Sequence, residues 1–337
     1  MIESRSTPAS STPAPDRRGF TITELLVVIG IIVLLIGILL PALGKVNERA
    51  KSTQTSAIME EFAKACEAFR QEFGFYPGLV PEDVLASDPK ISGTENALLH
   101  LMGGGVSQDD PAFDSLDGNW QTITFGSGAN QYRIKVNPSQ IGKGPRVGGK
   151  SYAPFFSPKT EELAPSDGQI GRNGVVEDAS TAPGDRLPDL VDAWGQPILY
   201  MRAIRGVGNL VGEANGSAPP RTQFVFDPIL PYLNSDSLGE LGKSQIDSII
   251  RVNNGNNRSR TVAQIIRHPG LGTPTLPETG TAKGQIVVIS AGKDGVYFSR
   301  YDGPGSPAAP VTNILNGTYG KPQVVEQYDD IIVFGGG

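Results

Sequence analysis

The sequence predicts an α+β fold in which one long N-terminal helix packs on a C-terminal antiparallel β-sheet. Three observations support this prediction. Residues 25–40 are apolar throughout, a polar segment with an apolar stripe of helical spacing continues to Phe73, and short β-type segments bounded by glycine or proline occupy much of the second half of the chain. A helix with one apolar stripe must bury that stripe against another layer, and a small sheet is the simplest cover.

The longest apolar stretch runs from Leu25 to Leu40. It has sixteen residues, of which fourteen are Leu, Ile or Val and two are Gly. With its apolar flanks the stretch reaches about twenty residues, enough for a helix to cross a hydrocarbon core of about 30 Å. Its side chains favour insertion by roughly 4 to 8 kcal/mol, which outweighs the cost of about 3 kcal/mol for one carboxylate. We therefore predict a membrane-spanning helix over residues 20–43.

The junction before this stretch reads Arg17-Arg18-Gly19-Phe20, and Glu24 follows shortly after it. The apolar stretch is longer than the core of a secretory signal peptide, and no small-x-small cleavage site follows it. The junction resembles the prepilin-type leader of type IV pilins and type II secretion pseudopilins. This resemblance implies that prepilin peptidase cleaves between Gly19 and Phe20 and that the new Phe20 amino terminus is methylated.

The same resemblance implies assembly roles for Glu24 and Pro41. Glu24 would accept the Phe20 amine of an adjacent subunit and so set the register of a filament. This agrees with the high cost of an unpaired carboxylate in a membrane, although a solvated Glu24 at headgroup level is the alternative. Pro41 stands where many members of the family carry a proline. It predicts a kink or a stop in the helix, and the helical pattern beyond it favours a kink.

The chain is expected to contain four segments: a cytoplasmic leader (1–19), a transmembrane and assembly helix (20–43), its amphipathic continuation (44–73) and a loop-rich α+β globular domain (74–337). Two arginines near the end of the leader favour a cytoplasmic N-terminus. The protein is therefore expected to cross the inner membrane once, with its globular domain in the periplasm. Glycine and proline account for 42 and 27 of the 337 residues, which predicts many loops. Residues 102–190 and 234–280 are expected to be insertions relative to shorter pseudopilins.

The amphipathic continuation has apolar side chains three or four residues apart, at Ile58, Phe62, Ala65, Phe69 and Phe73. Gly74 is expected to end the helix, and Pro77 prevents the helix from resuming. The following Phe75-Tyr76-Pro77-Gly78 turn, with a short helical segment at 95–99, resembles the helix exit of the major pseudopilin.

The strands expected from β-type composition and flanking turn residues are Gln121–Phe125, Gln131–Val136, Ile198–Arg202, Gln223–Phe226, Gln285–Ser290, Val296–Arg300 and Asp330–Phe334. The first two flank a Gly-rich turn and are expected to form a hairpin. Residues 192–200 resemble the Asp-x-Trp-Gly-x-Pro element that leads into the first strand of the pseudopilin sheet. The glycines at 206, 208 and 212 lack the spacing of a dinucleotide-binding fingerprint and indicate a loop.

A calcium site is one interpretation of the C-terminal region. The segment Ser290-Ala-Gly-Lys-Asp294-Gly, together with the later Asp330, resembles a loop that holds Ca²⁺ in the major pseudopilin. The resemblance implies oxygen ligands from Ser290, Asp294 and Asp330, which suit this hard cation. In this chain, however, Val296-Tyr297-Phe298 replaces the family's Gly-Gly. The alternative is a metal-free Asp-Gly hairpin turn. No other cofactor is predicted.

Several classes of function lack support in the sequence. The serine-hydrolase elbow, the zinc-protease motif and the P-loop do not occur, and the two histidines are far apart. The single Cys66 cannot form an intrachain disulfide and is expected to be a buried apolar residue. A net charge of −6 makes nucleic acid an unexpected partner. We therefore expect a chain without enzymatic activity.

The resemblance implies a structural subunit of a pseudopilus or type IV pilus-like filament that serves type II protein secretion. The implied partners are prepilin peptidase, identical or related pilin subunits in a homo-oligomeric filament, the inner membrane and the secretion-system assembly platform. Two alternatives stay open. The chain is a minor or tip subunit that binds a secreted substrate, or it is a membrane-anchored binding or enzymatic domain that uses the leader for export only.

Overall fold

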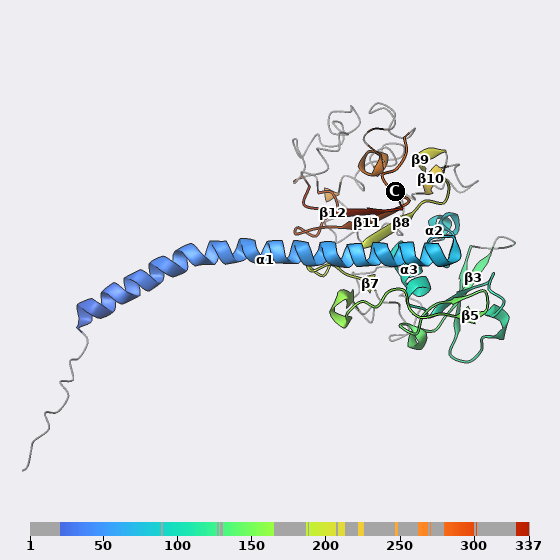
Figure 1. The fold of residues 1–337 in the computed structure, drawn as a ribbon, viewed down its shortest axis with the longest axis horizontal. Coiled ribbons are helices and arrows are strands. Elements are labelled where there is room, and N and C mark those ends of the chain that lie inside the picture. Colours follow the sequence, from blue (N-terminus) through green and yellow to red (C-terminus); the bar gives the residue numbers. More distant parts are fainter. Residues whose placement is uncertain are drawn as a thin grey trace, which may run out of the picture. The chain divides into compact units, whose positions relative to one another are not determined.

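The computed structural model describes residues 21–88, 90–126, 128, 131–164, 187, 189–206, 208–212, 222–225, 247–248, 262–268, 270, 280–299, 301 and 328–336. The chain divides into two compact units, Met1–Arg49 and Ala50–Gly337. Helix α1 (Ile22–Phe73) begins in the first unit and ends in the second (Figure 1). The α+β class is confirmed, because this long N-terminal helix is followed by antiparallel β-sheets. The four segment boundaries expected from the sequence stay predictions.

In the first unit, α1 exposes apolar side chains on every side. Leu26 is 62% exposed and Leu39 is 54% exposed. A helix that is apolar all round is typical of a membrane span. In the described part of the chain, α1 alone is long and apolar enough to cross a membrane. Pro41 lies inside this helix, so it does not stop the helix.

In the second unit, α1 buries the apolar stripe expected from its sequence. Phe62 and Phe69 are fully buried, and Phe62 meets the rings of Phe156 and Tyr200 edge-on at 5.4 Å. The stripe packs on the antiparallel sheet β12-β11-β8 (Figure 1). Its strands are β8 (Leu199–Arg202), β11 (Ile286–Ser290) and β12 (Ile331–Gly335). Gly74, with φ +82°, ends the helix in the left-handed conformation that glycine tolerates.

Strand β11 is the centre of this sheet because it is buried on both faces. Ile286 and Val288 point toward the α1 cluster. Val287 and Ile289 belong to a second cluster on the opposite face. That cluster includes residues of β9 (Asn209–Gly212), β10 (Thr222–Val225) and segment 262–266, as well as the rings of Tyr297 and Phe298. An uninterrupted Ile-Val-Val-Ile run is the composition expected of such a strand.

A second sheet, in the order β1-β3-β2, consists of β1 (Gly105–Ser107), β2 (Gln121–Phe125) and β3 (Tyr132–Val136). The predicted hairpin is confirmed as the antiparallel β2–β3 pair. Phe125 and Ile134 pack with Leu99 of α3 (Gly93–Leu101) and with Leu85 of α2 (Glu82–Ser87). Short pairs are formed by β4 (Arg146–Val147) with β5 (Lys150–Ser151), and by β6 (Leu163–Ala164) with β7 (Asp189–Leu190). Single 3₁₀ turns occur at Phe113–Ser115, Pro138–Gln140 and Thr160–Glu162.

Two expectations about the second unit were wrong. Residues 296–299 of the strand expected at Val296–Arg300 do not form a strand, because both edges of β11 are occupied by β8 and β12. The loop expected around the glycines at 206–212 contains β9, which pairs in parallel with β10. Leu210 and Val211 drive this pairing, since both are buried in the core. Most of the expected insertion at 234–280 lies outside the described residues.

Candidate functional site

The processing residues Gly19 and Phe20 lie outside the described residues, and Glu24 is in the first turn of α1. Thr21 donates from its backbone N to Glu24 Oε2 at 2.8 Å, and its Oγ1 donates to the same oxygen at 2.7 Å. In return Glu24 N donates to Thr21 Oγ1 at 3.2 Å. This reciprocal arrangement is a capping box at the start of the helix.

The capping box orients the Glu24 carboxylate and engages only one of its oxygens. Glu24 Oε1 accepts no hydrogen bond from the described residues. The carboxylate therefore keeps one oxygen for a further donor. The sequence analysis did not identify Thr21, although the spacing Thr-x-x-Glu before an apolar run is the signature of this cap.

The 192–197 turn, expected from the Asp-x-Trp-Gly-x-Pro element, is organised by one buried carboxylate. Asp192 Oδ1 accepts hydrogen bonds from Trp194 N and Gln196 N, each at 2.9 Å. Asp192 Oδ2 accepts from Ser290 Oγ at 2.7 Å. Burial raises the pKa of Asp192 to about 6, and these hydrogen bonds oppose that rise. Asp192 thus joins the turn before β8 to the end of β11.

The three predicted calcium ligands each form hydrogen bonds within the protein. Ser290 Oγ donates to Asp192, and Asp294 Oδ1 accepts from Val296 N at 2.8 Å. Both oxygens of Asp330 lie 2.9 Å from Phe298 N, which holds Phe298 at a φ of +49°. The described residues contain no group of three or more His, Cys, Asp or Glu residues that could hold a metal ion. The calcium site stays a prediction.

The neighbouring Asp329 completes the C-terminal loop. Its Oδ2 accepts hydrogen bonds from Lys293 N and Asp294 N, whereas Oδ1 is buried without one. A Cβ at Gly292 would lie 2.4 Å from the Asp329 carbonyl oxygen, so only glycine fits there. The alternative to a calcium site, an Asp-Gly hairpin turn between strands at Ile286–Ser290 and Val296–Arg300, was wrong, because residues 296–299 form no strand.

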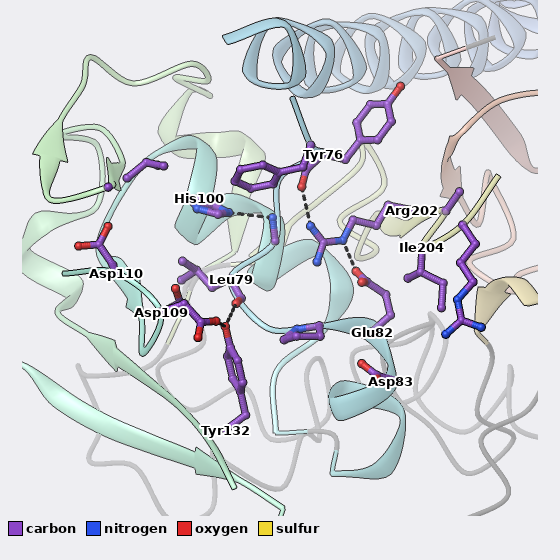
Figure 2. Close-up of a pocket in the computed structure, with 18 of the residues that line it drawn as sticks. Tyr76, Leu79, Glu82, Asp83, His100, Asp109, Asp110, Tyr132, Arg202 and Ile204 are labelled. Atoms are coloured by element: carbon purple, nitrogen blue, oxygen red, sulfur yellow. Dashed lines mark hydrogen bonds and ion pairs between the residues drawn. The ribbon is translucent and has the colours of Figure 1, made fainter. Parts of the chain in front are cut away.

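A pocket of about 610 Å³ opens beside the exit of α1, within the second unit. Figure 2 shows that Glu82, Asp109, Tyr132 and Arg202 border this pocket. Arg202, the last residue of β8, forms an ion pair with Glu82, and the side chain of each is 12% exposed. Arg202 also donates to the carbonyl oxygens of Tyr76 and Val80.

The loop that follows α1 is held by side chains from other elements. Three of its backbone groups bind residues of α3 or β8: Gly78 N donates to His100 Nδ1 at 3.0 Å, Val80 N donates to Asn96 Oδ1 at 2.9 Å, and the Pro77 carbonyl accepts from Tyr200 at 3.3 Å. A Cβ on Gly78 would lie 2.6 Å from Arg202 Cζ, so glycine lets the guanidinium pack against the backbone. The exit turn expected from the sequence is thus present and rigidly supported.

Two titratable groups near this loop are kept uncharged by burial. Burial, with a further contribution from the charge of Arg202, lowers the pKa of His100 to about 3. His100 is therefore a neutral acceptor for Gly78 at physiological pH. Cys66 is fully buried, and burial raises the pKa of its thiol. This agrees with its expected role as a small apolar residue.

Comparison with known proteins assigns only the N-terminal part of the chain. Residues 15–40 match the family described as the prokaryotic N-terminal methylation motif. With the long apolar helix, this match is consistent with a type IV pilin-like protein. It supports a pilin- or pseudopilin-type precursor that is processed by a prepilin peptidase and associates with a membrane.

A second comparison finds a partial similarity to the non-reducing polyketide synthase aoiG of Aspergillus oryzae. The two are 25% identical over 170 residues, which is 50% of this chain and 8% of the synthase. The chain thus spans a small fraction of that enzyme, and the synthase activity is not carried over. No solved structure matches the chain at a significant level.

Proposed function

We propose that this chain is a structural subunit of a pseudopilus or type IV pilus-like filament that serves type II protein secretion. Prepilin peptidase cuts between Gly19 and Phe20, and the mature chain polymerises through α1. Before assembly the chain crosses the inner membrane once, with its N-terminus in the cytoplasm and its globular domain in the periplasm. The proposed role is structural and not enzymatic. The observation that carries the proposal is Glu24, a carboxylate in the first turn of an apolar helix that matches the methylation motif.

The geometry at Glu24 supports pairing with a neighbouring subunit. Cleavage frees a positive amine on Phe20, and Thr21 already orients the Glu24 carboxylate through Oε2. Oε1 is left to accept the amine of an adjacent subunit. An ion pair gains strength in a medium of low dielectric constant, so the membrane or the interior of a filament favours this contact. Orienting the carboxylate in advance reduces the entropy lost on assembly.

A minor or tip subunit is the second candidate, and one observation favours it. The described part of residues 102–164 adds the β1-β3-β2 sheet and the β4–β5 pair to the second unit. These elements make each subunit larger, and larger subunits are harder to pack many times over in a filament. The number of copies in isolated filaments separates this candidate from a major subunit.

Mass spectrometry of the N-terminus tests the processing step. We expect the purified membrane form to begin at methylated Phe20. A polypeptide that still begins at Met1 would contradict the proposal. Replacing Gly19 with a bulkier residue should leave the leader attached.

Substitution of Glu24 tests assembly. Glu24→Ala and Glu24→Gln are both expected to abolish filaments in a pelleting assay, because each removes the charge that pairs with the amine. Glu60→Gln is the matched control, since Glu60 is an exposed acid on the same helix and forms an ion pair with Lys64 at 3.6 Å. Thermal unfolding of the globular domain should be the same in all three variants. Intact filaments in Glu24→Gln would exclude the proposed contact.

A further inference from the structure

The pocket beside the exit of α1 has walls from five parts of the second unit. They are the loop at 75–83, His100 of α3, the β1–β3 sheet, the β4–β5 turn, and the end of β8 with the residues that follow it. Its volume of about 610 Å³ lies within the range of pockets that enclose small ligands. Filament assembly through the first turn of α1 makes no use of this pocket.

The floor of the pocket is preformed. Arg202 binds Glu82 and two loop carbonyls, and Tyr132 donates from its hydroxyl toward both Asp109 Oδ2 at 2.8 Å and the Leu79 carbonyl at 3.1 Å (Figure 2). These contacts join segments that are distant in sequence and leave the loop little freedom. A rigid site loses little conformational entropy when it binds a ligand.

The pocket presents hydrogen-bond donors and acceptors side by side. The guanidinium groups of Arg146 and Arg205 form no hydrogen bond or ion pair with any of the described residues, so they are available as donors. Asp109 is exposed, and its Oδ1 accepts nothing from the described part of the chain. One carboxylate oxygen of Asp83 accepts a hydrogen bond from Val84 N, and the other accepts none from the described residues. The pocket therefore has both hydrogen-bond donors and hydrogen-bond acceptors that can bind a ligand.

The charges of the pocket favour neither an anion nor a cation. Four acids and three arginines line it: Glu82, Asp83, Asp109, Asp110, Arg146, Arg202 and Arg205. His100 adds no charge, because burial holds it neutral. An anionic ligand would meet the carboxylates, and a cationic one would meet the guanidiniums. A neutral hydroxyl group meets both without repulsion, because it donates to a carboxylate and accepts from a guanidinium.

An aromatic ring supplies an apolar surface beside these polar groups. Phe75 lines the pocket and is 43% exposed. Its ring is braced by Phe69 at 5.5 Å and by His100 at 5.7 Å. An aromatic ring that is held by neighbouring rings and is still partly exposed can pack against the C–H face of a ligand.

From these observations we propose that the pocket binds a neutral polyhydroxylated ligand, namely a short oligosaccharide. Its hydroxyl groups bridge Asp109 and Arg146 on the walls, and the apolar face of one sugar ring packs on Phe75. This inference stands independently of filament assembly, because it depends only on the second unit.

The test uses the full mature chain in lipid nanodiscs, since detergents with sugar headgroups would compete. Calorimetry and saturation-transfer NMR compare neutral trisaccharides of glucose, galactose, mannose and N-acetylglucosamine with tri-lysine and tri-glutamate. At least one trisaccharide is expected to bind, and neither charged peptide. Asp109→Asn, which preserves side-chain shape, and Arg146→Gln, which removes the guanidinium group, should each weaken this binding by about tenfold or more. Phe75→Ala should remove the NMR signal transfer from one sugar ring.

Lys64→Gln is the control, because Lys64 is an exposed residue of α1 that does not line the pocket. It should bind like the unmodified chain and show unchanged thermal unfolding. If no trisaccharide binds, the proposal is overturned. Tighter binding of either charged peptide, or trisaccharide binding that survives both Asp109→Asn and Arg146→Gln, also overturns it.

Discussion

Glu24 and Glu82 are two carboxylates held in opposite ways. Glu24 is exposed, and its support is Thr21, three residues away in the same helical turn. Glu82 is mostly buried, and its partner Arg202 lies 120 residues further along the chain. The contacts of Glu24 with Thr21 leave one carboxylate oxygen for a donor from another molecule. The Glu82–Arg202 ion pair joins the loop after α1 to the end of strand β8. A carboxylate with local support suits contact with another molecule, whereas one with a distant partner stabilises the tertiary fold.

The largest expected effect comes from breaking the distant pair. Arg202→Met leaves Glu82 buried without its counter-charge and removes the donors to the Tyr76 and Val80 carbonyls. Loss of one partner of a buried pair costs about 3–5 kcal/mol. Urea unfolding of the globular part, followed by tyrosine and tryptophan fluorescence, measures this loss. A change below about 1 kcal/mol would show that the pair does not hold the loop.

A double variant tests whether Glu82 and Arg202 stabilise the fold as a pair. Glu82→Gln combined with Arg202→Met removes both charges, so neither is left unpaired. The double variant should therefore lose less stability than the sum of the two single variants, by about 1–3 kcal/mol. Additive losses would mean that the two side chains act independently.

His100 gives the same region an acid-dependent stability. Its pKa is about 3 in the folded state, against 6.5 for an unperturbed histidine, so the unfolded chain binds the extra proton between these values. The contribution of His100 to stability is therefore complete above pH 6.5 and falls as the pH decreases toward 3. The loss is about 1.4 kcal/mol per pH unit, or roughly 2 kcal/mol at pH 5.

Urea unfolding at pH 5 and pH 7.5 measures the contribution of His100. His100→Asn keeps an acceptor for Gly78 and should reduce the difference between the two pH values. The other histidine, His268, is exposed, and His268→Asn should leave the difference unchanged. An equal pH dependence in all three proteins would exclude a role for His100.

The smallest expected effect is at the local cap. Thr21→Ala removes the hydroxyl that binds Glu24, and losing such a cap costs about 1 kcal/mol, or roughly fivefold in an equilibrium constant. Thr21→Ser keeps the hydroxyl and should assemble like the unmodified chain. Quantitative pelleting of filaments compares the two. Equal assembly of Thr21→Ala and Thr21→Ser would show that Glu24 does not need the Thr21 hydroxyl for assembly.

The elements predicted from the sequence and found in the structure are those whose determining residues lie close together in the chain. The apolar stretch, the stripe containing Phe62 and Phe69, the end of the helix at Gly74 and the β2–β3 hairpin all depend on local spacing. The strand expected at Val296–Arg300 was wrong because its composition fits a strand, but β8 and β12 already occupy the edges of β11. Local composition cannot show which strand takes an edge.

The pocket, and the contacts that hold the loop beside it, could not be predicted from local spacing in the sequence. Arg202 was expected only as the last residue of a strand, and nothing near it in sequence indicates pairing with Glu82. His100 and Tyr132 likewise lie in a helix and a strand whose patterns reflect packing. Each binds the loop at 76–82 across a sequence separation of 22 residues or more. Contacts of this kind arise when several elements fold together.

The sequence by itself determined the membrane-type helix, its methylation motif and the class of the fold, because these follow from runs and spacings within a few turns of chain. Tertiary structure alone decided the order of the strands, the engagement of Asp192 with Ser290, and the pocket around Arg202. The physical reason is that a hydrogen bond or ion pair between distant residues depends on packing that brings them together, and packing is a property of the whole unit.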